Sequence, residues 1–70
     1  MKETVRELFA RRVRKLRTAR GWSQDELAAK SGLHRSYVGI VERGEKSATL
    51  DTVERIAKAF NVEVSEFFED

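Results

Sequence analysis

The stretch that decides the fold is "QDELAAKSGLHRSYVGIVERG", residues 24–44. Its first residues have the spacing of an amphipathic helix. The pattern breaks at Ser31 and Gly32, because glycine tolerates the left-handed backbone that a sharp helix exit requires. A second apolar period starts a few residues later. The stretch therefore predicts two short helices, 24–31 and 35–42, joined by a tight turn.

The residues around this break meet the demands of a helix-turn-helix, in which a short glycine-containing turn joins two closely crossing helices. The inner face of the first helix needs a small residue, and Ala28 occupies that position. Gly32 supplies the positive φ of the turn. Val38 and Val41 are expected to anchor the second helix inward. The alternative is an αα-hairpin that only packs against the core.

An amphipathic helix is predicted over residues 4–20, before the opening stretch. Thr4 and Glu7 have the spacing of a capping box, in which each side chain satisfies the free backbone N–H of the other residue. Gly21 supplies the stop. The apolar stripe expected to face the core consists of Val5, Phe9, Val13 and Leu16.

Two more helices are predicted after the opening stretch. The first covers 50–60, with Thr49 as its cap and Asn61 as a left-handed stop; the second is a short segment, 66–70, capped by Ser65. The sequence thus predicts an all-α fold of five helices in a single domain that spans residues 1–70. The inner stripe of the 50–60 helix consists of Leu50, Val53, Ile56, Ala57 and Phe60.

The charge of the chain is unevenly distributed. The formal net charge is only +2, but residues 1–20 carry +6, residues 21–46 are balanced, and residues 47–70 carry −4. A basic N-terminal third can meet a polyanion while the acidic end faces elsewhere. The alternative is a solvated helix face that binds nothing, and charge alone does not decide between the two.

Composition narrows the class of protein further. Seventy residues bury a small core, so oligomerisation would add stability. The chain contains no cysteine and one histidine, which argues against disulfides and a metal site. No apolar run approaches the roughly 20 residues of a membrane span. We therefore expect a cytoplasmic protein with no membrane association, no cofactor, no metal and no evident small-molecule ligand.

The run from Phe9 to Phe68 resembles the lambda-repressor-like DNA-binding domain, also called the Cro/repressor or Xre-type family. The resemblance is carried by "RKLRTARGWSQDELAAKSGLHRSYVGIVERG" and "TLDTVERIAKAFNVEVSEFF" and covers nearly the whole chain. Within that family, "GLHRSYVGIVERGEKSATL" looks most like the controller proteins of restriction–modification systems. The resemblance implies a compact five-helix domain and a sequence-specific transcriptional regulator of double-stranded DNA.

In the DNA-binding form of this motif the second helix lies in the major groove, and its N-terminal residues reach base edges. Here these residues are His34, Arg35, Ser36 and Tyr37. Arg35 is the strongest candidate, because a guanidinium can bind guanine O6 and N7 together, worth about 1–3 kcal/mol of discrimination. His34 can cap the helix or contact a phosphate. The open alternatives are a phosphate contact for Arg35 and partial core packing for Tyr37.

A second group is expected to contact phosphates or to flank the bases. The resemblance implies a phosphate contact for Gln24, where the positive end of the helix dipole helps. Ser23 is mainly a cap. Resemblance to the controller proteins implies backbone or base contacts for Lys46 and Ser47, which follow the recognition helix together with Arg43. For Lys46 the alternative is an idle surface charge.

The resemblance also pairs Arg17 with Glu42 in a structural salt bridge. The chain departs from the family at three positions. Gly39 lies inside the recognition helix, where a small residue can let the backbone approach DNA. Ile40 stands where many relatives carry a polar residue, and it either reads a thymine methyl or is simply exposed. Ala48 replaces a common proline, which leaves the path of the following loop open.

A homodimer is expected because the core is small and one recognition helix reads few base pairs. Two-fold symmetry would place half-sites about 34 Å apart. The C-terminal part of the chain is more apolar than a short tail needs; some of its residues must close the core of one chain, and the remainder can form the interface. The candidate interface residues are Phe60, Val62, Val64, Phe67 and Phe68.

The sequence therefore favours a transcriptional regulator that binds a palindromic operator as a homodimer, as a restriction–modification controller protein does. An antitoxin-like protein that grips a partner toxin and regulates its own gene is the alternative. Such proteins usually carry an extra segment for the partner, which the sequence up to Asp70 does not suggest. An enzyme is least supported, because no glycine-rich phosphate loop and no catalytic constellation is evident.

Overall fold

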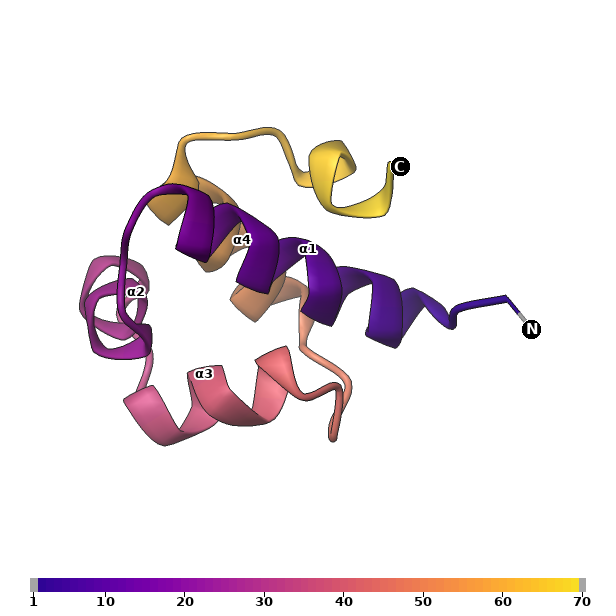
Figure 1. The fold of residues 1–70 in the computed structure, drawn as a ribbon, viewed down its shortest axis with the longest axis horizontal. Coiled ribbons are helices and arrows are strands. Elements are labelled where there is room, and N and C mark those ends of the chain that lie inside the picture. The colour runs from indigo at the N-terminus through magenta and orange to yellow at the C-terminus, as the bar shows by residue number, and fades with distance from the viewer. Residues whose placement is uncertain (1, 70) are drawn as a thin grey trace.

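The computed structural model describes residues 2–69, which form four α-helices and one 3₁₀-helix and contain no strand (Figure 1). The predicted helices 24–31, 35–42 and 50–60 are confirmed. The 4–20 helix is one residue shorter at each end, because Thr4 and Arg20 are its caps. The elements are α1 (Val5–Ala19), α2 (Gln24–Ser31), α3 (Arg35–Glu42), α4 (Leu50–Phe60) and η1 (Val64–Phe68).

The prediction of a fifth α-helix is wrong. The last element is a 3₁₀-helix that starts at Val64, before the predicted cap Ser65. The Glu63 N–H donates to the Glu66 carboxylate at 2.9 Å and closes the turn early. Phe67 is fully buried, and its ring meets the Phe9 ring edge-on with centroids 5.1 Å apart. Tertiary packing of one aromatic ring therefore fixes η1, and Asp70 lies outside the described residues.

The helix ends follow the predicted local signals. Thr4 and Glu7 form the capping box of α1, with Thr4 N–H donating to Glu7 Oε1 at 2.8 Å. Gly32 ends α2 with φ +71°, in the left-handed region that favours glycine. Asn61 ends α4 with φ +57°. Short-range chemistry therefore sets where each α-helix stops.

The core lies where the four α-helices and η1 converge. The prediction that Val5 and Leu50 face the core is wrong, because Val5 is 68% exposed and Leu50 is 87% exposed. Each is the first residue of its helix and projects beyond the packed region. The buried apolar residues are Phe9, Ala10, Val13, Leu27, Ala28, Val38, Val41, Val53, Ile56, Ala57, Phe60 and Phe67.

A pair of stacked aromatic rings, which the sequence did not predict, joins the α1–α2 connection to the end of α4. The rings of Trp22 and Phe60 are nearly parallel, with an interplanar angle of 6° and centroids 5.2 Å apart. The Arg20 guanidinium lies 5.5 Å from each ring centroid and donates to the Phe60 carbonyl at 2.8 Å. This contact satisfies a carbonyl at the helix end and covers aromatic surface.

The two helices of the central motif are steeply inclined to each other. In Figure 1, α2 is seen nearly end-on while α3 runs across the view along the outer edge of the molecule. One side of α3 packs through Val38 and Val41 on the core, and Arg35 and Ser36 at its start are exposed. The antiparallel αα-hairpin alternative therefore does not describe this pair. Among residues 2–69, no helix is long and apolar enough to cross a membrane.

Candidate nucleic-acid interface

The N-terminal end of α3 is capped by His34. Its Nδ1 accepts a hydrogen bond from the Ser36 backbone N–H at 3.1 Å, and the Ser36 Oγ lies 2.7 Å from the same nitrogen. Accepting the backbone hydrogen bond requires Nδ1 to be unprotonated. His34 thus takes the capping role that Ser or Thr fills elsewhere, and it holds the Ser36 hydroxyl beside it.

Arg35 is the first residue of α3, and its side chain is 71% exposed. The guanidinium therefore points to the surface and not into the core. Its Nη1 lies 3.6 Å from Oδ2 of Asp25, in the first turn of α2. The Asp25 side chain is itself 66% exposed. The predicted base reader thus has a carboxylate neighbour on the same face.

Tyr37 lies between the surface and the core. Its ring is half-buried against the hydrophobic cluster, and its hydroxyl is 3.4 Å from Oγ1 of the buried Thr52. The packing alternative for Tyr37 is therefore what the structure shows. A base contact by Tyr37 stays a prediction, as do the base contacts of His34 and Ser36.

Gln24 belongs to a network that ties the motif to α1. Arg17 Nε lies 2.6 Å from Glu42 Oε2, and Arg17 Nη2 donates to Glu42 Oε1 at 3.0 Å, which is the predicted salt bridge. Gln24 Nε2 also donates to Glu42 Oε1, at 3.2 Å. Donating these hydrogen bonds to the Glu42 carboxylate raises the pKa of the Arg17 guanidinium. Ser23 caps α2 through its hydroxyl, which accepts from the Glu26 N–H at 3.0 Å.

The loop after α3 holds the remaining predicted contacts. Arg43 Nε donates to Glu45 Oε2 at 2.7 Å. This hydrogen bond raises the pKa of Arg43 and lowers that of Glu45. Lys46 and Ser47 are exposed in the same loop. Arg35, Arg43 and Lys46 are therefore exposed cations on α3 and its following loop, and Arg35 and Arg43 already face acidic neighbours.

A shallow polar groove runs between the start of α2 and the open side of α3. Gly39 lies at its floor, where an added Cβ would come within 3.0 Å of Arg43 Nη1 and 3.7 Å of Gln24 Oε1. Ile40, next to it, is half-buried. Lys46 and Ser47 do not line this groove. The lining residues are Gln24, Asp25, Arg35, Ser36, Gly39 and Arg43.

Sequence reasoning missed the two acids of this surface. The contact between Asp25 and Arg35 crosses the turn between the two helices, so no helical spacing predicts it. Glu45 lies two residues after Arg43 and could have been found as a local ion pair. Carboxylates repel phosphates, so the residue pattern of a DNA-binding surface predicts neither acid.

The five residues predicted for a dimer interface divide into two groups. Phe60 and Phe67 are fully buried within one chain, so the assignment of these two to an interface between chains is wrong. Both rings are needed to close the core of the single domain. Val62 is half-buried, while Val64 and Phe68 are exposed.

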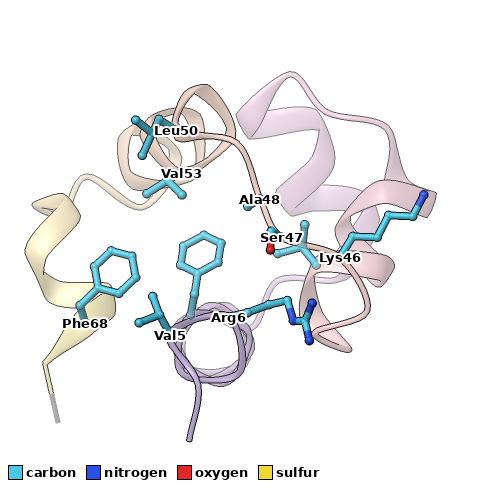
Figure 2. Close-up of a pocket in the computed structure, with 10 residues that line it drawn as sticks. Val5, Arg6, Lys46, Ser47, Ala48, Leu50, Val53 and Phe68 are labelled. Atoms are coloured by element: carbon cyan, nitrogen blue, oxygen red, sulfur yellow. The ribbon is translucent and has the colours of Figure 1, made fainter.

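Exposed apolar side chains continue around an open groove between α1, α4 and η1. Figure 2 shows Val5, Leu50, Val53 and Phe68 around this opening, with Lys46 at one side. Phe68 stacks on the Phe9 ring at the floor, with centroids 5.9 Å apart. Val5 and Leu50, which sequence reasoning placed in the core, are therefore candidates for a surface that a second chain covers.

The steep α2–α3 pair with its positive-φ glycine turn and open α3 face defines a helix-turn-helix protein. The family described as "Helix-turn-helix" matches residues 13–67, so the chain belongs to that family. It is similar to the control protein C.SmaI of Serratia marcescens, with 47% identity over 60 residues that cover 86% of this chain and 71% of the relative.

Two solved structures extend the comparison. The restriction–modification controller protein C.AhdI from Aeromonas hydrophila superposes with a TM-score of 0.86 at 48% identity, covering 90% of this chain and 96% of that one. The controller protein C.Esp1396I, solved as a tetramer in complex with its natural 35 base-pair operator, superposes with a TM-score of 0.85 at 30% identity. That alignment covers 96% of this chain and 88% of the other.

Proposed function

We propose that this protein is a sequence-specific, DNA-binding transcriptional regulator that binds a two-fold symmetric operator as a homodimer. The observation that carries the proposal is the N-terminal end of α3, which is capped by His34 and presents the exposed Arg35 guanidinium beside the polar groove. A recognition helix uses this end to reach base edges in the major groove.

In this proposal the two sets of side chains have separate tasks. Arg35 binds O6 and N7 of a guanine and supplies direct readout. Ser36, Tyr37 and His34 are expected at neighbouring bases. The phosphate contacts, which position the domain without reading sequence, are assigned to Ser23, Gln24, Arg43, Lys46 and Ser47.

The proposed homodimer interface lies at the apolar groove between α1, α4 and η1. A domain of this size gains stability by covering exposed apolar area, and Val5, Leu50 and Phe68 offer such area around one opening. A two-fold contact at this groove, joined by Val62 and Val64, would repeat the recognition helix at a fixed spacing. We place the interface at this groove in preference to Phe60 and Phe67.

The similarity to C.SmaI and C.AhdI supports the narrower role of a restriction–modification controller protein acting in the cytoplasm. The operator-bound tetramer of C.Esp1396I shows that a relative with this fold binds operator DNA as an assembly. We carry that behaviour over to this chain as part of the proposal.

Selection from a library of random-sequence duplexes tests the proposal. Wild-type protein is expected to enrich a two-fold symmetric sequence and to shift it at moderate salt, while Arg35→Ala loses the preference at one symmetric pair of positions. Lys46→Ala is the matched control, because loss of a phosphate contact weakens binding to all sequences alike. No enriched sequence with wild-type protein would contradict the proposed function.

A further inference from the structure

The Arg35 guanidinium, which is predicted to bind a base, lies beside a carboxylate on the protein surface. Arg35 Nη1 and Asp25 Oδ2 are 3.6 Å apart, and both side chains are more than half exposed on the wall of the polar groove. The Asp25 carboxylate therefore lies on the surface that a duplex would cover. An acid at that place repels phosphates, and it improves discrimination only if this repulsion is stronger on DNA that lacks the recognised guanine.

The effect of Asp25 depends on where the Arg35 guanidinium goes. On a site with guanine, the fork of the guanidinium binds O6 and N7, and its remaining N–H groups can keep facing the carboxylate. On a site without guanine, the best remaining acceptor is a phosphate. Reaching that phosphate separates Arg35 from Asp25 and leaves the carboxylate unpaired beside the DNA backbone.

We infer that Asp25 is a specificity-determining residue, which acts by holding Arg35 away from phosphates and so lowers the affinity for DNA that lacks the recognised guanine. This inference rests on the proposed function. It assigns to an acidic side chain of α2 a role in discrimination that the basic residues of the interface do not supply by themselves.

Glu45 is a second acid that holds a cation of the proposed interface, but a different effect on DNA binding is expected from it than from Asp25. It holds Arg43 through a hydrogen bond of 2.7 Å, but Arg43 is assigned a phosphate contact, which every sequence offers equally. Removing the Glu45 charge should strengthen binding to all duplexes without changing their ratio. Glu54, which lines a separate hollow on α4 with Arg55 and Lys58, controls for net charge alone.

The experiment compares Asp25→Asn, Glu45→Gln and Glu54→Gln in the full chain. Each binds the duplex enriched from the random library and a duplex of equal length and composition with scrambled sequence. Asp25→Asn is expected to tighten binding to the scrambled duplex about two- to fivefold, with little change on the enriched one. Glu45→Gln tightens both alike, and Glu54→Gln changes neither by more than the net charge requires.

A double-mutant cycle tests whether the effect of Asp25 on DNA affinity depends on Arg35. In an Arg35→Ala background, Asp25→Asn should tighten binding to the enriched and the scrambled duplex by the same factor, because the carboxylate then only repels the phosphates that both duplexes share. The inference is overturned if Asp25→Asn leaves the scrambled duplex unchanged, or if Glu54→Gln has the same effect. If wild-type protein enriches no sequence at all, the proposed function fails first, and that result is distinguishable from an enriched site with unaltered discrimination.

Discussion

The Glu42 carboxylate connects three helices through its hydrogen bonds. It is buried at the end of α3 and accepts from Arg17 of α1 and from Gln24 of α2. A buried charge is tolerable only when it is paired and hydrogen-bonded. The network also fixes the carboxamide of Gln24, so the first residue of α2 reaches the polar groove in a defined orientation.

Glu42→Gln is therefore expected to destabilise the domain by about 3 kcal/mol, because the Arg17 guanidinium loses its counter-charge in a largely buried place. Urea denaturation at a fixed protein concentration measures the free energy of unfolding. Glu3→Gln is the matched control: it breaks the exposed ion pair with Arg11 and should cost about 1 kcal/mol or less. Equal losses for the two variants would contradict the structural role of Glu42.

Gly39→Ala is expected to raise the stability of the domain and to lower its affinity for DNA. The helical position of Gly39 makes Gly39→Ala stabilising by about 0.5–1 kcal/mol, since the one tight contact of the new Cβ is with the flexible end of Arg43 and its 3.7 Å distance to Gln24 Oε1 is an ordinary van der Waals contact. The same methyl group fills the floor of the polar groove, so affinity for the enriched duplex should fall. Thermal unfolding and electrophoretic mobility shifts on one preparation measure the change in stability and the change in DNA affinity. A Gly39→Ala variant that binds DNA as well as wild type would show that the DNA does not closely approach the backbone at Gly39.

At the scale of elements, local chemistry accounts for what could be predicted. Capping boxes at Thr4 and Ser23 and the left-handed stops at Gly32 and Asn61 act within a few residues, so the α-helix bounds follow from sequence. The α3 start and its exposed Arg35 follow from the same register. This part of the candidate site is encoded locally.

The remainder depends on contacts between residues far apart in the chain. Phe67 is placed by its packing on Phe9, which no helical period reveals. Val5 and Leu50 continue the apolar stripes of their helices and yet extend beyond the core, so periodicity alone assigns them wrongly. Asp25 meets Arg35 only because the turn brings two helices together.

The start of α1 predicts a pH dependence. The hydrogen bonds that Glu7 accepts from Thr4 lower the pKa of the Glu7 carboxyl below its ordinary value. A lowered pKa in the folded state means that this stabilisation is present above the unfolded pKa and is lost as pH falls through the folded pKa. Glu7→Gln should therefore be less stable than wild type at neutral pH and equally stable in acid.

Thermal unfolding of wild type and Glu7→Gln at a series of pH values tests this sign. Glu54→Gln, on the exposed face of α4, serves as a control for the general loss of one exposed acid. A stability difference between wild type and Glu7→Gln that stays constant from neutral to acidic pH would show that the ionised carboxylate contributes nothing to the cap.

For the molecule as a whole, the basic N-terminal third serves the fold more than sequence suggested. Four of its eight basic side chains bind groups of the same chain: Arg11 to Glu3, Arg12 to the Glu66 carbonyl, Arg17 to Glu42 and Arg20 to the Phe60 carbonyl. Net charge by segment thus overstates the cationic surface of α1. The cations along α3 and its following loop carry the proposed interface.

The dimer proposal belongs to this scale. Leu50→Glu places a charge at the rim of the apolar groove, on a side chain that contributes little to the core. We expect this variant to remain folded and to sediment as a monomer at concentrations where wild type is a dimer. Ala19→Glu, an exposed change near the far end of α1, should leave the association state unaltered. A Leu50→Glu dimer of unchanged stability would place the interface elsewhere.

The central claim is that Arg35 reads a guanine from the start of α3, and a single atomic substitution in the DNA tests it. In the enriched duplex, 7-deazaguanine replaces the guanine at the symmetric pair of positions, which removes N7 and leaves Watson–Crick pairing intact. Wild-type protein is predicted to lose affinity about tenfold or more, as expected for a broken bidentate contact, while Arg35→Ala binds both duplexes equally. Equal binding of both duplexes by wild-type protein, or an equal loss with Arg35→Ala, would contradict the account.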